Sequence, residues 1–193
     1  MKKLIAVLLF FPIMGSYSQK WEKNYDYVDD CVCGLSKVAK NGKVGYVNKK
    51  GVEVIKPQYD DGLTFSEGYS AVKHGAKWLY LDSTGRIITD PIFDDAHNFS
   101  NGLAAVSMNE LFGYINTSGE LVISFQFSNA NVFSEGLASV ANTKGLWGYI
   151  DKKGNWIIKP EYNFANAFEN GEARVMKDDK VFYIDKVNKM VHE

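Results

Sequence analysis

Residues 144–162 read KGLWGYIDKKGNWIIKPEY, and weaker copies of this stretch recur along the chain. Its first tyrosine returns at steps of 34, 34, 35 and 34 residues, as Tyr46, Tyr80, Tyr114, Tyr149 and Tyr183. A glycine downstream keeps nearly the same step, as Gly51, Gly85, Gly119 and Gly154. Self-similarity at a fixed period of this length indicates one supersecondary unit repeated in tandem.

Each copy contains three short apolar segments separated by turn residues, which favours a three-stranded antiparallel meander. In the quoted copy the first strand is expected at 147–150, and Gly154 supplies the positive φ of a tight turn. The second strand is expected at 156–158, and Pro160 is expected to end it because proline has no N–H for the ladder. The third strand, expected at 172–176, leads into the first strand of the next copy.

The connection between units carries an aromatic, a small residue and an aromatic at steps of three, as in Phe93, Ala96 and Phe99. This spacing favours a short helical turn that directs all three side chains into the core. The second aromatic recurs as Phe65, Phe99, Phe133 and Phe168. Cys31 holds that position in the first copy, which predicts a small buried residue rather than a disulfide partner of Cys33.

The repeat predicts one all-β domain over residues 25–193, built from tandem units of about 34 residues. A single meander leaves most of its apolar face exposed, so the units must stack to be stable. We expect an open, stacked array of three-stranded antiparallel meanders. A closed ring of five propeller-like units is the alternative, because the chain starts with a third strand near 34–38 and ends with a first and second strand near 181–191.

Several motifs occur in constant order within each copy, and they are best preserved as Trp147-Gly148, the stretch 154–162 and the stretch 168–175. This pattern resembles the signature of the WG-repeat family over nearly all of residues 25–192. The Trp-Gly pair is varied elsewhere, as Val44-Gly45, Trp78-Leu79 and Phe112-Gly113. The resemblance implies a bacterial all-β repeat protein, often exported, with no established catalytic activity and no catalytic residues to carry over.

The N-terminus has the layout of a secretory signal peptide over residues 1–18. Two lysines precede an apolar run over residues 4–14, and Ser18 offers a small residue for cleavage. The run is shorter than the roughly 20 residues that span a membrane. We therefore expect a linker over residues 19–24 and export to the periplasm, the medium or the cell surface, without membrane insertion after cleavage.

Without residues 1–18 the chain carries 20 basic and 23 acidic residues, a formal charge of −3. A chain so close to neutral lacks the cationic face that a phosphate backbone requires, so nucleic acid is not an expected partner. The sequence shows no Gly-rich phosphate loop, no nucleophile elbow and no spacing typical of metal ligands. It therefore predicts no cofactor, no metal site and no catalytic residues.

Two acidic pairs, Asp60-Asp61 and Asp94-Asp95, recur one period apart in the connections between units. Paired carboxylates bind calcium or act in acid–base catalysis, but they also accept hydrogen bonds in turns. Later copies have serine and asparagine at the first of these positions, which favours the turn role.

Trp156 is a further candidate ligand contact, because an exposed tryptophan stacks on a sugar or a peptide. Ile87 and Leu121 hold the same position in two other copies, which favours a buried role. The other shared positions, including Trp78, Trp147 and Gly148, are interpreted as structural.

Repetition builds an extended surface, so we expect a non-enzymatic binding or scaffold protein of the bacterial cell envelope with a protein or glycan partner. The alternative is a hydrolase that acts on envelope glycans or peptides through the acidic residues of the connections. A third possibility is a structural subunit of a larger complex.

Overall fold

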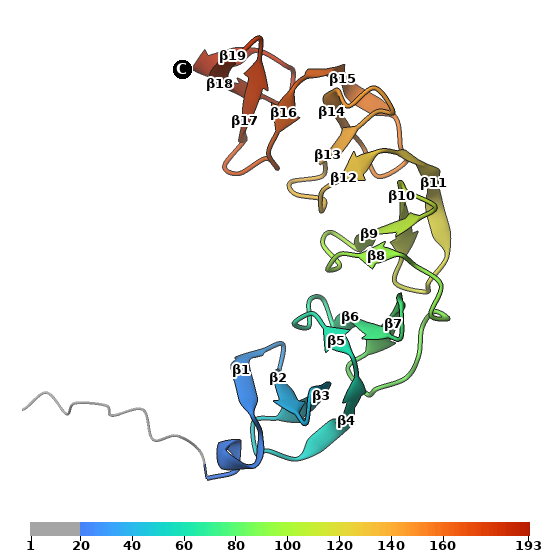
Figure 1. Cartoon of the computed structure of the whole chain (residues 1–193). Coiled ribbons are helices and arrows are strands. Elements are labelled where there is room, and N and C mark those ends of the chain that lie inside the picture. The colour runs from blue at the N-terminus through green and yellow to red at the C-terminus, as the bar shows by residue number, and fades with distance from the viewer. Residues whose placement is uncertain (1–19) are drawn as a thin grey trace, which may run out of the picture.

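Five antiparallel sheets follow one another along a crescent in the computed structural model, which describes residues 20–193 (Figure 1). The described chain has one short 3₁₀ helix, η1 (Glu22–Asn24), and otherwise consists of strands and turns. No helix among residues 20–193 is long and apolar enough to cross a lipid bilayer. The signal peptide predicted for residues 1–18 lies outside the described residues.

The sheets follow the order of the chain. The first comprises β1 (Tyr27–Val32), β2 (Leu35–Lys40), β3 (Lys43–Asn48) and β4 (Glu53–Tyr59). The second comprises β5 (Asp61–Gly62), β6 (Tyr69–His74) and β7 (Lys77–Asp82). The third comprises β8 (Asp95–Ala96), β9 (Leu103–Met108), β10 (Leu111–Asn116) and β11 (Leu121–Phe127). The fourth comprises β12 (Asn129–Ala130), β13 (Ala138–Ala141), β14 (Trp147–Ile150) and β15 (Trp156–Tyr162). The fifth comprises β16 (Phe164–Ala165), β17 (Glu172–Lys177), β18 (Lys180–Asp185) and β19 (Met190–His192).

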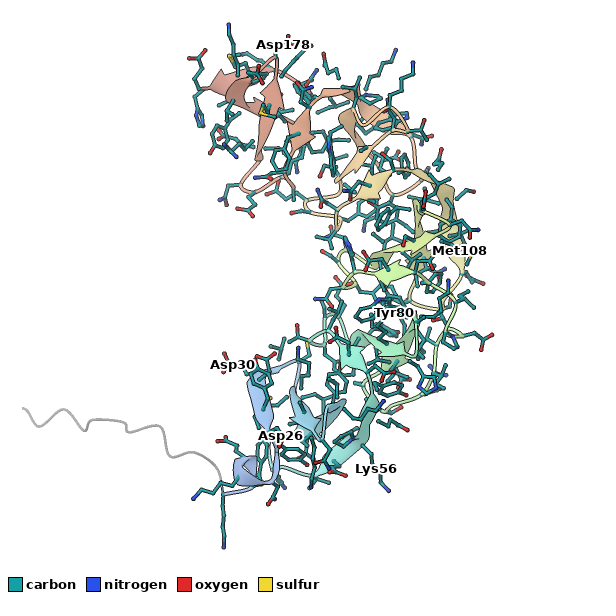
Figure 2. All side chains as sticks on the ribbon, in the orientation of Figure 1. Asp26, Asp30, Lys56, Tyr80, Met108 and Asp178 are labelled. Atoms are coloured by element: carbon teal, nitrogen blue, oxygen red, sulfur yellow. The ribbon has the colours of Figure 1, made fainter. Side chains whose placement is uncertain are left out.

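Strands follow the same spatial order in every sheet, which confirms the predicted all-β array of tandem units. The first and last sheets share no strand pairing within residues 20–193, so the array is open and not closed into a ring (Figure 1). Lys56 on β4 projects from the convex side of the crescent into solvent, whereas Tyr80 lies within the body of the crescent (Figure 2).

The connections between units are extended, so the helical turn predicted for them is wrong. In β8, Asp95 pairs with Ser107 and Ala96 pairs with Val106 of β9. The same short strand occurs as β5, β12 and β16, and it adds an inner strand to the predicted meander. Sheet pairing thus satisfies the backbone of this segment, while its bends still bury Phe93, Ala96 and Phe99.

The outer strands β4 and β15 run through Pro57 and Pro160, so the expectation that proline ends this strand is wrong. Both are edge strands, and their pairing with β3 and β14 shifts register around the proline. A bulge leaves residues outside the ladder, so a missing N–H is tolerated there.

The same bulge explains the glycine of the Trp-Gly pair. A Cβ atom at Gly148 would lie 2.5 Å from the carbonyl oxygen of Ile158, and the equivalent glycines of the first and third units are equally close to their outer strands. Leu79 replaces this glycine in the second unit. In that unit the strand predicted at 87–89 is reduced to isolated bridges, Trp78 with Phe93 and Leu81 with Ile87.

The repeated tyrosine joins each sheet to the next, and it is fully buried in four units. Its ring packs on a phenylalanine of the following unit, with centroids 4.9 Å apart for Tyr114 and Phe133. Its hydroxyl donates to a backbone carbonyl of that unit: Tyr46 to Leu63, Tyr80 to His97, Tyr114 to Asn131 and Tyr149 to Asn166, at 2.6, 2.6, 2.7 and 2.8 Å. Burial raises the pKa of all four, since the phenolate would lose its hydration.

Tyr183, the fifth copy, is only half-buried, because no later unit within the described chain covers it. Its ring stacks on His192 of β19, with centroids 4.3 Å apart.

Trp21 covers the open side of the first unit. A Cβ atom at Gly51 would lie 2.1 Å from Cγ of Trp21, whereas the same position at Gly85 faces Ile55 of the preceding unit. Trp21 therefore takes the place of an isoleucine that a preceding unit supplies elsewhere. Within the segment 19–24 predicted as a linker, the described residues form η1 and this N-terminal cap.

Cys31 and Cys33 are exposed free thiols, so the prediction that Cys31 is buried is wrong. In the second unit the corresponding Phe65 packs on Tyr46 of the unit before it. Within residues 20–193 no sheet precedes the first unit, so nothing equivalent covers Cys31.

Candidate binding groove

The turns between β5 and β6, β8 and β9, and β12 and β13 lie on the concave side of the crescent (Figure 1). They are hydrogen-bonded from unit to unit. A serine hydroxyl donates to the carbonyl of the phenylalanine one unit on: Ser66 to Phe99, Ser100 to Phe133 and Ser134 to Phe168, at 2.7, 2.6 and 2.6 Å. The carboxylate of Glu67 accepts the backbone N–H groups of Asn101 and Gly102, both at 2.8 Å. These bonds fix the spacing of the turns, so the concave side is a preformed surface.

A groove of about 690 Å³ lies along this side over the last three units. Its polar lining comprises His97, Asn131, Asn166, Glu169, Asn170, Glu172, Arg174 and Tyr183, and its apolar lining comprises Val132 and Ala167. The strands β8, β12 and β16 each end one residue before a polar lining residue. These residues are His97, Asn131 and Asn166, and the repeat therefore places their side chains one unit apart.

Arg174 is the unpaired cation of the groove. Its side chain is exposed on β17 and makes no ion pair or hydrogen bond within residues 20–193. Lys186 nearby is engaged by Glu135 at 2.9 Å, and this pairing lowers the pKa of the Glu135 carboxyl. Glu172 is likewise engaged, because His192 Nε2 lies 3.0 Å from its carboxylate. The guanidinium of Arg174 is thus available to a ligand.

The polar end of the groove arises because the outward face of the last sheet departs from the repeat. Arg174 stands where the inner units have the buried small residues Ala71, Ala105 and Ser139. Glu172 stands where the third and fourth units have Leu103 and Leu137. His192 similarly replaces the buried isoleucines Ile123 and Ile158. This face therefore presents charge and hydrogen-bonding groups where the inner interfaces present core.

Four segments of the chain match one known protein family. The profile described as WG containing repeat matches residues 45–78, 80–111, 112–143 and 147–180. This chain belongs to the WG-repeat family. No curated protein matches its sequence.

Solved structures resemble this WG-repeat protein at low sequence identity. Hsv2p of Kluyveromyces lactis is 13% identical with a TM-score of 0.55, over 86% of this chain and 62% of that one. A eukaryotic initiation factor is 11% identical with a TM-score of 0.57, over 85% of this chain and 52% of that one. The computationally designed protein Ika8 is 13% identical with a TM-score of 0.52, over 81% and 56%. The WG-repeat chain thus spans less than two thirds of each, and at these identities the likeness concerns the fold alone.

The first acid of each predicted pair clamps a hairpin of its WG unit. Asp60 accepts Lys43 Nζ at 2.5 Å and the N–H of Gly75 at 2.7 Å. Asp94 does the same with Lys77 and with the N–H of Asn109. In both cases the lysine hydrogen bond, then the backbone bond, lowers the pKa of the carboxyl. Asp26 and Asn163 accept the N–H groups of Asn41 and Asp178 in the same way.

The second acid of each pair accepts the next backbone N–H. Asp61 accepts the N–H of Gly62 at 2.7 Å, and Asp95 accepts the N–H of Ala96 at 2.8 Å. Asp95 also lies 3.9 Å from His97 Nε2. None of the four predicted aspartates is among the residues that line the groove. Within residues 20–193, no group of three or more histidine, cysteine, aspartate and glutamate side chains is placed to hold a metal ion.

Trp156 is exposed on the outer strand β15, so the buried role that its sister positions favour is wrong. Ile87 and Leu121 are 59% and 46% exposed, which shows that this position faces solvent in all three units. The indole packs edge-on against Phe127, with centroids 5.7 Å apart, and it does not line the groove.

The groove residues Asn166, Arg174 and Tyr183 were not singled out as ligand contacts by the sequence reasoning. A signal for them exists in the repeat alignment. Position 174 changes from a small residue to arginine in the last copy alone among the inner and last units, and Glu172 and His192 replace residues that are apolar in the third and fourth copies.

Proposed function

We propose that this WG-repeat protein is a non-enzymatic binding module of the bacterial cell envelope, which holds an envelope protein or glycan along its concave side. The ladder of hydrogen-bonded concave turns carries the proposal, because it presents side chains at fixed intervals on a curved surface. Arrays of repeats use such surfaces for extended partners.

Two further features support it. The acids of the connections are hydrogen-bonded acceptors in hairpin clamps with lowered pKa values at Asp60 and Asp94, which makes these two groups poor proton donors near neutral pH. The envelope location rests on the signal-peptide pattern of residues 1–18 and on the family resemblance.

A sedimentation assay tests the concave side as the binding surface. Residues 19–193 are mixed with peptidoglycan sacculi or with solubilised envelope proteins of a Gram-negative bacterium. The double variant Val132→Arg/Ala167→Arg fills the groove with two cationic side chains. The double variant Val122→Arg/Ile157→Arg is the matched control, because both residues are exposed on outer strands and the added charge is the same.

We expect the wild type and the outer control to bind one of the two fractions, and the groove variant to bind at least tenfold more weakly. Equal binding by all three proteins, or no binding of the wild type to either fraction, would overturn the proposal.

A further inference from the structure

The groove ends at the last sheet of the described chain, β16–β19. At the inner interfaces the tyrosine hydroxyl is already hydrogen-bonded to the next unit. Tyr149, for example, donates to the carbonyl of Asn166 at 2.8 Å. The hydroxyl of Tyr183 has no hydrogen-bond partner within residues 20–193, although the ring is held by stacking on His192. Arg174 projects beside it on the neighbouring strand, where it pairs in register with Tyr183. A fixed aromatic hydroxyl and an unpaired guanidinium therefore share one end of the groove.

The remaining lining supplies groups for neutral hydroxyls. The carboxamides of Asn166 and Asn170 have no side-chain hydrogen bond within the described chain, and each offers a donor and an acceptor. Glu169 adds an acceptor, since its carboxylate also has no partner within residues 20–193. A ligand with several hydroxyl groups and one anionic group satisfies this set.

The same features disfavour a peptide. The inner edge strand β16 is two residues long, which is too short to template an added strand. Val132 and Ala167 are the only apolar aliphatic residues of the lining, so this groove of the described chain offers no site for a large apolar anchor.

We propose that the C-terminal end of the groove binds a carboxylated saccharide. The sugar carboxylate pairs with the guanidinium of Arg174, and sugar hydroxyls bond to Tyr183, Asn166 and Asn170. A guanidinium suits this role because it binds a carboxylate through two parallel hydrogen bonds. The inference rests on the proposed function, in which the concave side is the binding side, and it supplies the ligand class.

Isothermal titration calorimetry on residues 19–193 tests the assignment. The probes are tetragalacturonate and hyaluronan tetrasaccharide, which carry carboxylates, and cellotetraose and chitotetraose, which do not. A hexapeptide of glutamate is the peptide probe. The variants are Arg174→Ala, Arg174→Lys and Tyr183→Phe. Lys144→Ala is the control, since it removes one exposed cation from a hairpin turn.

We expect at least one carboxylated probe to bind at least tenfold more tightly than its neutral counterpart. Arg174→Ala should weaken that binding about tenfold or more, because a charge-assisted hydrogen bond to a buried ligand is lost. Arg174→Lys should have an affinity between those of the wild type and Arg174→Ala. Tyr183→Phe should weaken binding a few-fold by loss of one hydrogen bond. Lys144→Ala should bind with the affinity of the wild type.

Equal affinity for charged and neutral sugars, no binding of any sugar, or full affinity in Arg174→Ala would overturn the proposal. Tighter Arg174-dependent binding of the glutamate peptide would also overturn it. If the groove variant Val132→Arg/Ala167→Arg loses envelope binding while no acidic sugar binds the wild type, the proposed function stands and the ligand class is wrong. If acidic sugars bind the wild type but neither envelope fraction does, the ligand class stands and the proposed function is wrong.

Discussion

At the scale of single residues, the tyrosine hydroxyl is the contact that most clearly distinguishes an inner unit from the last. It is buried and bonded to the next unit in four copies, whereas in Tyr183 it faces the groove. The same side chain thus serves stability in four copies and is available for recognition in the fifth.

Replacing Tyr114 by phenylalanine should destabilise the fold. The change leaves the ring in place but removes the donor to the buried carbonyl of Asn131, which costs about 1–3 kcal/mol in the free energy of unfolding. The matched change Tyr183→Phe should cost less than about 0.5 kcal/mol, because its hydroxyl bonds to nothing in the described chain. Urea unfolding followed by tryptophan fluorescence measures both. Equal losses in the two variants would contradict this account.

Asp82 makes the stability sensitive to acid. Hydrogen bonds from the side chain of Thr84, from backbone N–H groups and from Arg86 lower its pKa from 3.8 to about 2. A carboxyl whose pKa is lower in the folded state stabilises the fold above its unfolded value, and that contribution disappears as the pH falls through the folded value. Asp82→Asn should therefore be less stable than the wild type at pH 7, by up to about 1 kcal/mol.

The stability difference should shrink as the pH is lowered from about 4 to about 2, because the wild-type carboxyl protonates in that window. Thermal unfolding at a series of pH values measures it. A difference that stays constant down to pH 2 would show that the turn geometry, not the charge, carries the effect.

At the scale of elements, the outer strand depends on one glycine. Gly148→Ala places a methyl group 2.5 Å from the carbonyl oxygen of Ile158, so β15 must move away. We expect a loss of about 1–3 kcal/mol in the free energy of unfolding, as for other overpacked sites, and weaker pairing of β15 with β14. Hydrogen exchange of the amides in 156–162 reports the change directly. Unchanged protection of these amides would rule out the proposed role of the glycine.

Much of the unit was predictable, because strands and tight turns leave local patterns. The first and third strands and the glycine turns follow from alternation and period. The connection was not predictable, since a step of three between buried residues arises in a bent, extended segment as well as in a helical turn. The expectation that Pro160 ends the outer strand was wrong for a related reason. Only the bulge, which depends on the pairing of two strands, makes a proline acceptable there.

At the scale of the whole molecule, the two ends of the crescent differ from its interior. Trp21 fills the place of a preceding unit's isoleucine, and Glu172, Arg174 and His192 make the opposite end face polar. Comparison of the last copy with the inner copies reveals the substitutions at this end, but their meeting beside Tyr183 depends on how the last sheet packs. That is why the groove could not be derived from the residues alone.

An open array should tolerate removal of one whole unit. Deleting residues 103–136, which is 34 residues, joins Gly102 to Leu137 and restores the same junction that each unit makes with the next. The shortened chain should fold cooperatively, with a urea m-value smaller by about one fifth, because the surface exposed on unfolding falls in proportion. Small-angle X-ray scattering should show a shorter crescent.

Deleting residues 103–119, half a unit, is the control and should abolish the native circular dichroism spectrum, since the strands lose register with the following sheet. If the one-unit deletion fails to fold as well, the units are not interchangeable layers of an open array.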